Sequence, residues 1–313
     1  MKFGTTFSHR QLQHLSCPVS KALDKAIELN FDYLRICAYW DEIEKIEGEY
    51  DWSQLEKILN TCQKNQQGVV LTLGVKAPRY PEFYWPDWIE KKDPNHKQTQ
   101  EKILNFTKKT IKKFKHLSCI KYYQIENEAL DPSGPDNLVI PLSFLTKEIS
   151  EVKKLDKVNG KAREGALGHN RRVITSLWAN ELSRRNLLPQ LTKSSDIVGL
   201  DLYYQQFVGK ILGKSFYMGP LDSQQKIKKL LTKNTQEFWI MELQAEPWEA
   251  NKHDYLAKNP KSISPEKIKS SYQQVSRLPV STILFWGFEY WFYQLHKNNN
   301  HSYFEIISDI ISS

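Results

Sequence analysis

The chain has 313 residues, of which 40% are hydrophobic and 26% are charged, and its mean hydropathy is -0.57. This composition is typical of a globular protein and excludes a disordered or fibrous chain. No apolar run approaches the ~18 residues that a membrane-spanning helix needs, so a transmembrane protein is excluded and no membrane partner is expected.

The net charge of +8 could indicate an acidic partner such as a nucleic acid. The lysines gather at helical spacing beside apolar residues in three segments, 108-KKTIKKFKH-116, 153-KKLDK-157 and 226-KIKKLLTK-233. This pattern is typical of the solvated face of an amphipathic helix, and we therefore predict no nucleic-acid partner. A phosphate-binding surface is the alternative interpretation.

The first ten residues, MKFGTTFSHR, have neither the apolar segment nor the small-residue cleavage site of a secretion signal, which predicts a cytoplasmic location. Secretion, with the signal already removed, is the alternative interpretation. The four cysteines are scattered along the chain, so we expect free thiols that serve packing. The eight histidines show no H-x-x-H or H-E-x-x-H spacing, and we expect neither a metal nor an organic cofactor.

Eight short runs rich in β-branched and aromatic residues follow one another along the chain, and each has the length of a β-strand. In chain order, the predicted strands are 2-KFGTTFS-8, 32-DYLRICAYW-40, 68-GVVLTLG-74, 120-IKYYQIENE-128, 172-RVITSLW-178, 196-DIVGLDLYY-204, 237-EFWIMELQA-245 and 281-STILFWGFEYW-291.

Amphipathic stretches with helical periodicity fill the intervals between these strands. Ser53 and Glu56 have the spacing of a capping box, which predicts that one helix opens there. The other predicted helices cover residues 18–29, 97–114, 141–155, 180–188, 223–233, 264–278 and 303–311.

Eight strands alternating with eight helices predict a single (β/α)8 TIM barrel that spans residues 1–313 as one catalytic domain. An open doubly wound sheet is the alternative, but neither G-x-G-x-x-G nor a P-loop follows any predicted strand. The stretch 158–172 is long for a connection from helix to strand, and we expect it at the N-terminal face of the barrel, away from the chemistry.

Two glutamates are embedded in apolar strand sequence, Glu128 at the end of the fourth predicted strand and Glu242 within the seventh. A buried carboxylate is costly unless it is hydrogen-bonded, neutralised or kept for chemistry. Barrel enzymes carry their catalytic groups at the C-terminal ends of strands, and a pair of carboxyl groups is what glycoside hydrolysis requires. A buried salt bridge is the alternative for each glutamate.

The segment 35-RICAYWDEIEKIEGEYDW-52, the pair Asn127-Glu128, Tyr203, Glu242 and Trp286 occur in an order that resembles clan A of the glycoside hydrolases. These are retaining β-glycosidases on TIM barrels, and the chain is most similar to the cellulase-like family 5 and β-galactosidase-like family 42 types. The resemblance covers residues 3 to 291, and the phrase E-L-Q-A-E-P-W is also similar to a bacterial branch of cellulase-like proteins.

This resemblance implies a role for each matching residue. Glu128 would be the general acid and base, Asn127 would hold the 2-hydroxyl of the sugar, and Glu242 would be the nucleophile. Arg35 would pair with the charge of the nucleophile and Tyr203 would donate a hydrogen bond to it. Trp286 would form the floor of the sugar subsite, with a core tryptophan as the alternative interpretation.

Some positions leave alternatives open. Glu126 lies on the same face of an ideal strand as Glu128, so the backbone must bend after Ile125 for Asn127 and Glu128 to share a site. Glu246 is a similar rival to Glu242, although it precedes Pro247 and is expected to begin the loop. The ends of the fifth and sixth predicted strands lack the histidine that many clan members carry near the site, so the resemblance does not carry over the substrate of any one family.

Aromatic residues follow several predicted strands, and an aromatic cleft with polar margins suits the apolar faces of sugar rings. From them we select Tyr39, Trp40 and Trp248 as substrate contacts, together with Arg79 and Glu82 from the proline-stiffened loop 76-KAPRYPEFYWPDW-88. For about half of the aromatic residues the alternative is simple packing, which we expect for Trp52, Trp88 and Trp239.

The sequence therefore predicts a retaining β-glycoside hydrolase with a carbohydrate substrate and no particular oligomeric state. A transglycosylase would use the same two carboxylates. A non-catalytic glycan-binding barrel and a basic protein that binds an acidic polymer are the alternatives from other functional classes.

Overall fold

The computed structural model describes residues 1–156 and 170–313. Eight parallel strands form a closed barrel in the order β1-β10-β9-β6-β5-β4-β3-β2, which confirms the predicted (β/α)8 fold. The barrel strands are β1 (Lys2–Phe7), β2 (Tyr33–Cys37), β3 (Gly68–Leu73), β4 (Ile120–Ile125), β5 (Arg172–Trp178), β6 (Ile197–Leu202), β9 (Glu237–Gln244) and β10 (Thr282–Trp286).

The helices are α1 (His9–His14), α2 (Val19–Glu28), α3 (Trp40–Ile43), α4 (Ser53–Lys64), α5 (Lys97–Phe114), α6 (Leu142–Asp156), α7 (Leu182–Arg185), α8 (Leu188–Ser194), α9 (Gln224–Thr232), α10 (Lys252–Tyr255), α11 (Pro265–Val275), α12 (Phe288–Asn298) and α13 (Ser302–Ser312). A hairpin of β7 (Gln206–Ile211) and β8 (Lys214–Met218) follows β6.

The chain divides into two compact units. The first consists of Met1–Leu34, Trp178–Asn186 and Leu200–Ser313, and the second of Arg35–Leu177 and Leu187–Gly199. That residues 1–313 form one catalytic domain stays a prediction.

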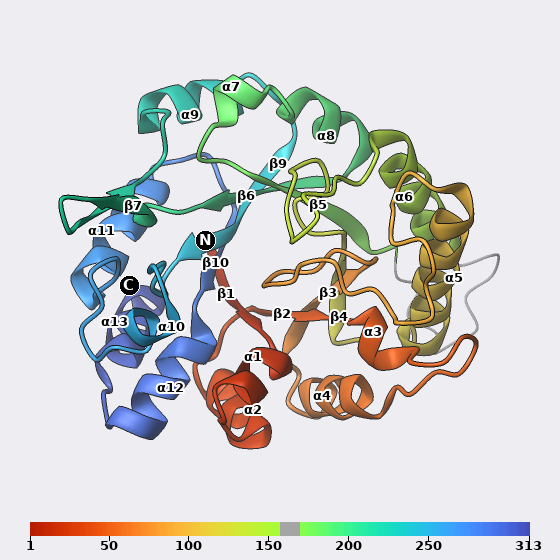
Figure 1. The fold of residues 1–313 in the computed structure, drawn as a ribbon, viewed down its shortest axis with the longest axis horizontal. Coiled ribbons are helices and arrows are strands. Elements are labelled where there is room, and N and C mark those ends of the chain that lie inside the picture. The colour runs from red at the N-terminus through yellow and green to blue at the C-terminus, as the bar shows by residue number, and fades with distance from the viewer. Residues whose placement is uncertain (157–169) are drawn as a thin grey trace. The chain divides into compact units, whose positions relative to one another are not determined.

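In the first unit, β1 pairs with β10 and β10 pairs with β9, and helices cover their outer side (Figure 1). Helix α11 packs on β9 and α12 on β1. The backbones approach so closely at Gly4 that a Cβ atom there would lie 2.4 Å from the carbonyl oxygen of Tyr33. Aromatic rings of α12 and α13 fill the layer outside β10, with Trp291 edge-on to Phe285 and to Phe304.

In the second unit, β3 pairs with β4 and β4 with β5, while α4 packs on β3 and α6 on β4. A buried ion pair fixes the approach to β5: the Arg171 guanidinium lies 2.6 Å from Asp156 at the end of α6. Arg171 also donates to the carbonyl oxygens of Ile120, Lys115 and Leu117, so its charge and its donors are satisfied inside the protein.

Two local expectations need correction, a third lies outside the described residues, and one element was not predicted. The predicted strand 281–291 ends at Trp286, because Gly287 adopts a φ of 148° and α12 begins directly after it. The β7–β8 hairpin was not predicted. Ser53 makes no capping bond: it is the first residue of α4, and its backbone N–H is bound by Asp51. Residues 158–169 of the predicted long connection lie outside the described residues.

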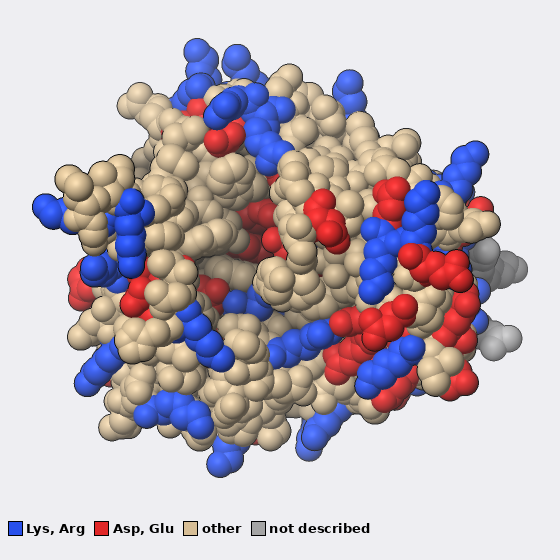
Figure 2. Space-filling view, in the orientation of Figure 1, with Lys and Arg blue, Asp and Glu red and all other residues tan. Residues whose placement is uncertain are grey.

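The described residues of the lysine-rich segments lie on helices α5, α6 and α9 or directly after them, as predicted. Figure 2 shows basic and acidic side chains interspersed over α5 and α6 of the second unit. Several lysines of α5 form ion pairs of 2.8–3.0 Å, namely Lys102 with Glu47, Lys108 with Glu151 and Lys113 with Glu56. That the chain has no nucleic-acid partner stays a prediction.

All four cysteines are free and buried, which confirms their predicted packing role. Within residues 1–156 and 170–313, no three His, Cys, Asp or Glu side chains are grouped as metal ligands. In the same part of the chain, no helix combines the length and the apolar character needed to cross a bilayer.

The Asp156–Arg171 pair provides a test of the second unit. Removing the carboxylate by Asp156→Ala leaves the buried guanidinium without its counter-charge and should lower the free energy of unfolding by about 3–5 kcal/mol in urea denaturation. The control is Lys25→Ala, which removes an exposed ion pair with Glu28 and should cost less than about 1 kcal/mol. Equal effects of the two substitutions would show that the buried pair does not anchor the unit.

Candidate active site

Glu242 lies within β9, near its C-terminal end, and only 2% of its surface is exposed. The hydroxyl of Tyr203, which follows directly after β6, donates a hydrogen bond to the Glu242 carboxylate. The backbone of Tyr203 is held in turn by Asn180, which accepts from its N–H at 2.9 Å and donates to its carbonyl oxygen at 2.7 Å. These two bonds fix the backbone of Tyr203, the residue whose phenol contacts Glu242.

An exposed indole stands beside this pair. The ring of Trp248 lies edge-on to that of Tyr203, with 5.0 Å between centroids, and 42% of the Trp248 surface is exposed. The Trp248 backbone N–H donates to the hydroxyl of Ser262 at 2.9 Å, which anchors the loop that carries the indole. A large apolar plate next to a polar strand end is the kind of surface on which a sugar ring stacks.

Glu246, the rival to Glu242, follows the end of β9 and is 7% exposed. It accepts a hydrogen bond of 3.1 Å from the hydroxyl of Tyr255. Trp286 ends β10 and is also 7% exposed, and its carbonyl oxygen accepts from the backbone N–H of Ala245 at 2.8 Å. The first unit therefore gathers Tyr203, Glu242 and Trp248 at the ends of β6 and β9.

In the second unit, the backbone bends after β4 as the sequence required. The strand ends at Ile125, and both Glu126 and Glu128 adopt positive φ angles, of 53° and 42°. These left-handed conformations are uncommon for residues other than glycine and break the alternation of an ideal strand. As a result, the strict alternation that would turn Asn127 away from Glu128 does not hold in this segment.

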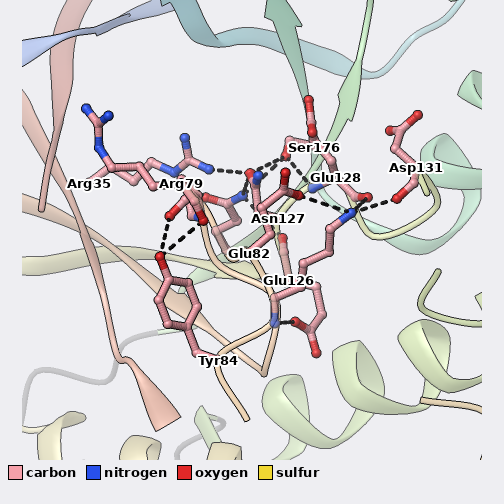
Figure 3. A network of polar contacts seen from close by, with 12 residues as sticks. Arg35, Arg79, Glu82, Tyr84, Glu126, Asn127, Glu128, Asp131 and Ser176 are labelled. Atoms are coloured by element: carbon pink, nitrogen blue, oxygen red, sulfur yellow. Dashed lines mark hydrogen bonds and ion pairs between the residues drawn. The ribbon is translucent and has the colours of Figure 1, made fainter. Parts of the chain in front are cut away.

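A polar network holds Asn127 (Figure 3). Its side-chain oxygen accepts from Arg35 at 2.5 Å and from the hydroxyl of Ser176 at 3.2 Å. Arg35 is fully buried and also donates to Gln124 at 2.7 Å. Since these donors occupy the amide oxygen, the amide NH2 group of Asn127 is the part that can donate to a ligand.

Ser176 also supports Glu128, because its hydroxyl accepts from the Glu128 backbone N–H at 3.1 Å. Neither Ser176 nor Gln124 was selected from the sequence. Both are polar residues inside otherwise apolar strands, and this was the signal that could have identified them.

Lys76 was also missed, although it directly follows the apolar run of β3. Its ammonium group is fully buried and donates to the carbonyl oxygens of Glu128 and Asp131, both at 2.7 Å. The Glu82 carboxylate lies 3.9 Å from the same ammonium. Lys76 thus ties the loop after β3 to the segment that carries Glu128, and this segment cannot shift without breaking two charge-assisted bonds.

Glu126 differs from Glu128 because its carboxylate is used to bind backbone N–H groups of the neighbouring loop. Its carboxylate accepts from the backbone N–H groups of Val75 at 3.1 Å and Lys76 at 2.5 Å. It fills the space beside Gly74, where a Cβ atom would lie 2.2 Å from the Glu126 carboxyl carbon. Burial raises the pKa of Glu126 to about 7, against the lowering effect of these two hydrogen bonds.

Glu148 of α6 completes a pair of buried carboxyl groups with Glu126. Burial, and then the charge of Glu126, raise the pKa of Glu148 well above its usual range. No hydrogen-bond donor reaches the Glu148 carboxyl oxygens from the residues that the structure describes. Because ionised carboxylates only accept, a proton held between the two groups supplies the missing donor at neutral pH.

The loop 76–88 carries the remaining candidates. Arg79 and Glu82 both have positive φ angles, of 78° and 67°, and the Tyr84 hydroxyl donates to the Arg79 carbonyl oxygen at 3.1 Å. The rings of Tyr84 and Tyr39 pack at 4.6 Å within a buried cluster, so Tyr39 is 2% exposed.

Trp40 is a correction to the predicted substrate contacts. It is fully buried, its indole N–H donates to Glu44 at 2.6 Å, and its ring stacks on Phe106 of α5. Its indole therefore has no face to offer a ligand and belongs to the core. Trp88, expected in packing, lies edge-on to Trp40 and donates to the carbonyl oxygen of Glu44.

Comparison with known proteins identifies the fold. No family model matches the chain, and no curated protein matches it in sequence. Among solved structures, it is similar to a GH5_18 protein from Bifidobacterium longum in complex with Manβ1-4GlcNAc, with a TM-score of 0.64 and 11% identity over 100% of this chain and 78% of that one. A GH5_18 protein from Streptomyces cattleya in complex with GlcNAc gives 0.58 and 14% over 91% and 70%.

The β-galactosidase of Marinomonas ef1 is similar with a TM-score of 0.59 and 11% identity, over 91% of this chain. The chain spans about half of that protein, since 54% of the β-galactosidase is covered. The fold implied by the resemblance to clan A is therefore confirmed: the chain has the TIM-barrel architecture of glycoside hydrolases.

The buried carboxyl pair predicts how stability depends on pH. Because both pKa values are raised, the folded chain holds protons that the unfolded chain releases above about pH 4.5, and stability should fall as the pH rises through about 7. In Glu148→Gln, the amide donates to Glu126 and has no proton to lose. In this variant, the decrease in the free energy of unfolding with rising pH should be smaller, by up to about 1.4 kcal/mol per pH unit for each proton concerned. The measurement is urea unfolding at pH 5 to 8.

Glu90→Gln, at an exposed glutamate, is the matched control and should keep the pH dependence of the parent protein. The shared-proton interpretation fails if Glu148→Gln keeps the parent's full slope.

Proposed function

We propose that the chain is a retaining β-glycoside hydrolase that cleaves β-linked glycans or oligosaccharides through a covalent glycosyl-enzyme intermediate. The observation that carries the proposal is that Glu242, inside β9, accepts a hydrogen bond from Tyr203 beside the exposed indole of Trp248. A positioned carboxylate next to an aromatic plate is what attack on a stacked sugar ring needs. The similarity in fold to glycoside hydrolases supports the same reaction class.

In the proposed reaction, Glu242 attacks the anomeric carbon and forms an ester bond to the sugar. The bond from the anomeric carbon to the leaving oxygen breaks, and Glu128 gives its proton to that oxygen. In the second step, Glu128 takes a proton from a water molecule while the oxygen of that water attacks the anomeric carbon. The ester bond between this carbon and Glu242 breaks. The enzyme returns to its starting protonation state, and the sugar keeps its β configuration.

The fixed backbone around Glu128 supports its role as acid and base. Its N–H is bound to Ser176, its carbonyl oxygen is bound to Lys76, and its side chain is half-buried. The mechanism further requires the two carboxyl groups to be about 5–5.5 Å apart, whereas an inverting enzyme would hold them about 6.5–9.5 Å apart. An experimental structure with a fluorosugar bound to Glu242 tests this requirement directly.

For the substrate, we propose that the NH2 group of Asn127 binds a sugar hydroxyl and that Trp248 stacks on the ring. Arg35 and Tyr203 act as positioning residues, through Asn127 and Glu242 respectively. Tyr39, Arg79, Glu82 and Trp286 stay proposed substrate contacts. The mechanism uses no metal and no organic cofactor.

The nucleophile is tested by Glu242→Gln, with Glu246→Gln as the matched control. An amide cannot form the glycosyl ester, so Glu242→Gln should reduce hydrolysis of an activated aryl β-glycoside to the uncatalysed background, while Glu246→Gln keeps most activity. The measurements are initial rates and the position of the peptide labelled by a fluorosugar. Loss of activity in Glu246→Gln alone, with the label on Glu246, would assign the nucleophile to the rival.

The acid and base is tested by Glu128→Gln on a series of leaving groups. A good leaving group needs no proton, so the first step should be spared, whereas poor leaving groups should react more slowly by ~10² to 10⁴. The rival Glu126→Gln should instead change stability, because Glu126 binds backbone N–H groups. Equal slowing of all substrates by Glu128→Gln would contradict the role. Tight oligosaccharide binding without cleavage in the parent protein would favour a glycan-binding barrel.

A further inference from the structure

The β7–β8 hairpin is an addition to the barrel that the proposed reaction does not use. It lies in the first unit, and its strands pair from Gln206↔Met218 at the base to Ile211↔Lys214 at the tip (Figure 1). The base is fixed to the loop after β9: the Phe207 N–H donates to the carbonyl oxygen of Trp248 at 3.2 Å. The tip projects away from these anchors.

The hairpin exposes apolar side chains, most strongly at its turn. There, Leu212 is 98% exposed and Ile211 is 63% exposed. Nearer the base, Val208 is 55% exposed and Phe216 is 45% exposed. Scattered exposed apolar residues are normal, but two adjacent ones, Ile211 and Leu212, at the tip of a projecting element indicate an interaction surface.

Leu212 also occupies its position against its conformational preference. The two turn residues, Leu212 and Gly213, have φ angles of 49° and 78°. A two-residue hairpin turn with two positive φ angles favours Asn-Gly, because a branched side chain is disfavoured in the left-handed region. A leucine here is unfavourable for the backbone conformation and exposes an apolar side chain to water. We therefore interpret the apolar side chain itself as the functional feature of this position.

Two lysines flank this apolar tip. Lys210 and Lys214 lie on either side of Ile211-Leu212-Gly213, and the sequence from Leu202 to Leu221 contains no aspartate or glutamate. Figure 2 shows tan and blue side chains where the hairpin projects on the left, with red ones below them. The tip therefore offers aliphatic side chains at its end and positive charge beside them.

We propose that the tip of the β7–β8 hairpin binds a lipid bilayer that contains anionic lipids, with Leu212 and Ile211 entering the interface and Lys210 and Lys214 pairing with headgroups. Aliphatic side chains gain by leaving water, and lysines beside an anionic surface add attraction. A symmetric contact with a second copy would bring the same lysines together, which is unfavourable. A glycan would stack on an aromatic ring, whereas the two turn residues and Ile211 beside them are a glycine and aliphatic residues.

Bilayer binding would bring the loop that carries Trp248 towards the membrane surface, because the hairpin base is bonded to that loop. The inference revises the expectation that the chain has no membrane partner, and it concerns attachment to one leaflet, without a spanning segment. It does not depend on the proposed hydrolase activity, since the hairpin contains none of the proposed catalytic residues.

The test is cosedimentation of the full chain with phosphatidylcholine vesicles that do or do not contain phosphatidylglycerol. We expect binding to the anionic vesicles only, and weaker binding as salt is raised. Leu212→Asn places in the turn a residue that favours its backbone, so the variant should fold as well as the parent and bind about tenfold more weakly or worse. Lys210→Gln with Lys214→Gln should weaken binding by about 30-fold.

Two matched controls remove equal character elsewhere. Ile46→Asn removes an apolar residue that is 60% exposed, and Lys228→Gln with Lys229→Gln removes two exposed charges of α9. Both should bind as the parent does. The inference is overturned if anionic vesicles are not bound, if the controls weaken binding as much as the hairpin variants, or if the parent forms a dimer in solution that Leu212→Asn abolishes.

Discussion

The segment that carries Asn127 and Glu128 depends on one constraint: the polar groups buried beneath it must all find partners inside the protein. The Glu126 carboxylate accepts two backbone N–H groups of the loop after β3, and Lys76 of that loop donates back to the carbonyl oxygens of Glu128 and Asp131. Unpaired buried polar groups are costly, so the two loops hold each other in a single arrangement. The positive φ angles at Glu126 and Glu128 persist because this network over-determines the backbone.

The end of β9 uses the same physical device with different residues. Tyr203 is fixed through its backbone by Asn180, and its hydroxyl meets the Glu242 carboxylate in a buried environment. Polar contacts thus hold the side chain of Glu242 and the backbone segment that carries Glu128. With only 11–14% identity to the similar solved structures, what the chain shares with them is the barrel fold.

The hairpin after β6 follows the opposite logic. Where the buried networks pair the polar groups around Asn127 and Lys76, the tip keeps an aliphatic side chain in water and a leucine in a left-handed conformation. Both features are unfavourable in the isolated chain, and a binding partner that removes Leu212 from water would offset the first. The anchor to the Trp248 loop links this surface to the proposed substrate-binding part of the same unit.

The sequence by itself determined the eight barrel strands, the helices α5 and α6, and the choice of Glu128 and Glu242, because hydrophobic periodicity and a carboxylate inside an apolar run are local signals. The sequence analysis extended the last strand beyond Trp286, because the residues after Gly287 are as apolar and aromatic as those of the strand. It also predicted Trp40 in the substrate cleft, because a tryptophan buried under α5 has the same local sequence as one at a surface. Only the tertiary structure decided the roles of Lys76, Ser176 and Glu148. Their partners lie about 20 to 50 residues away along the chain, and a contact between distant segments leaves no periodic trace in either of them.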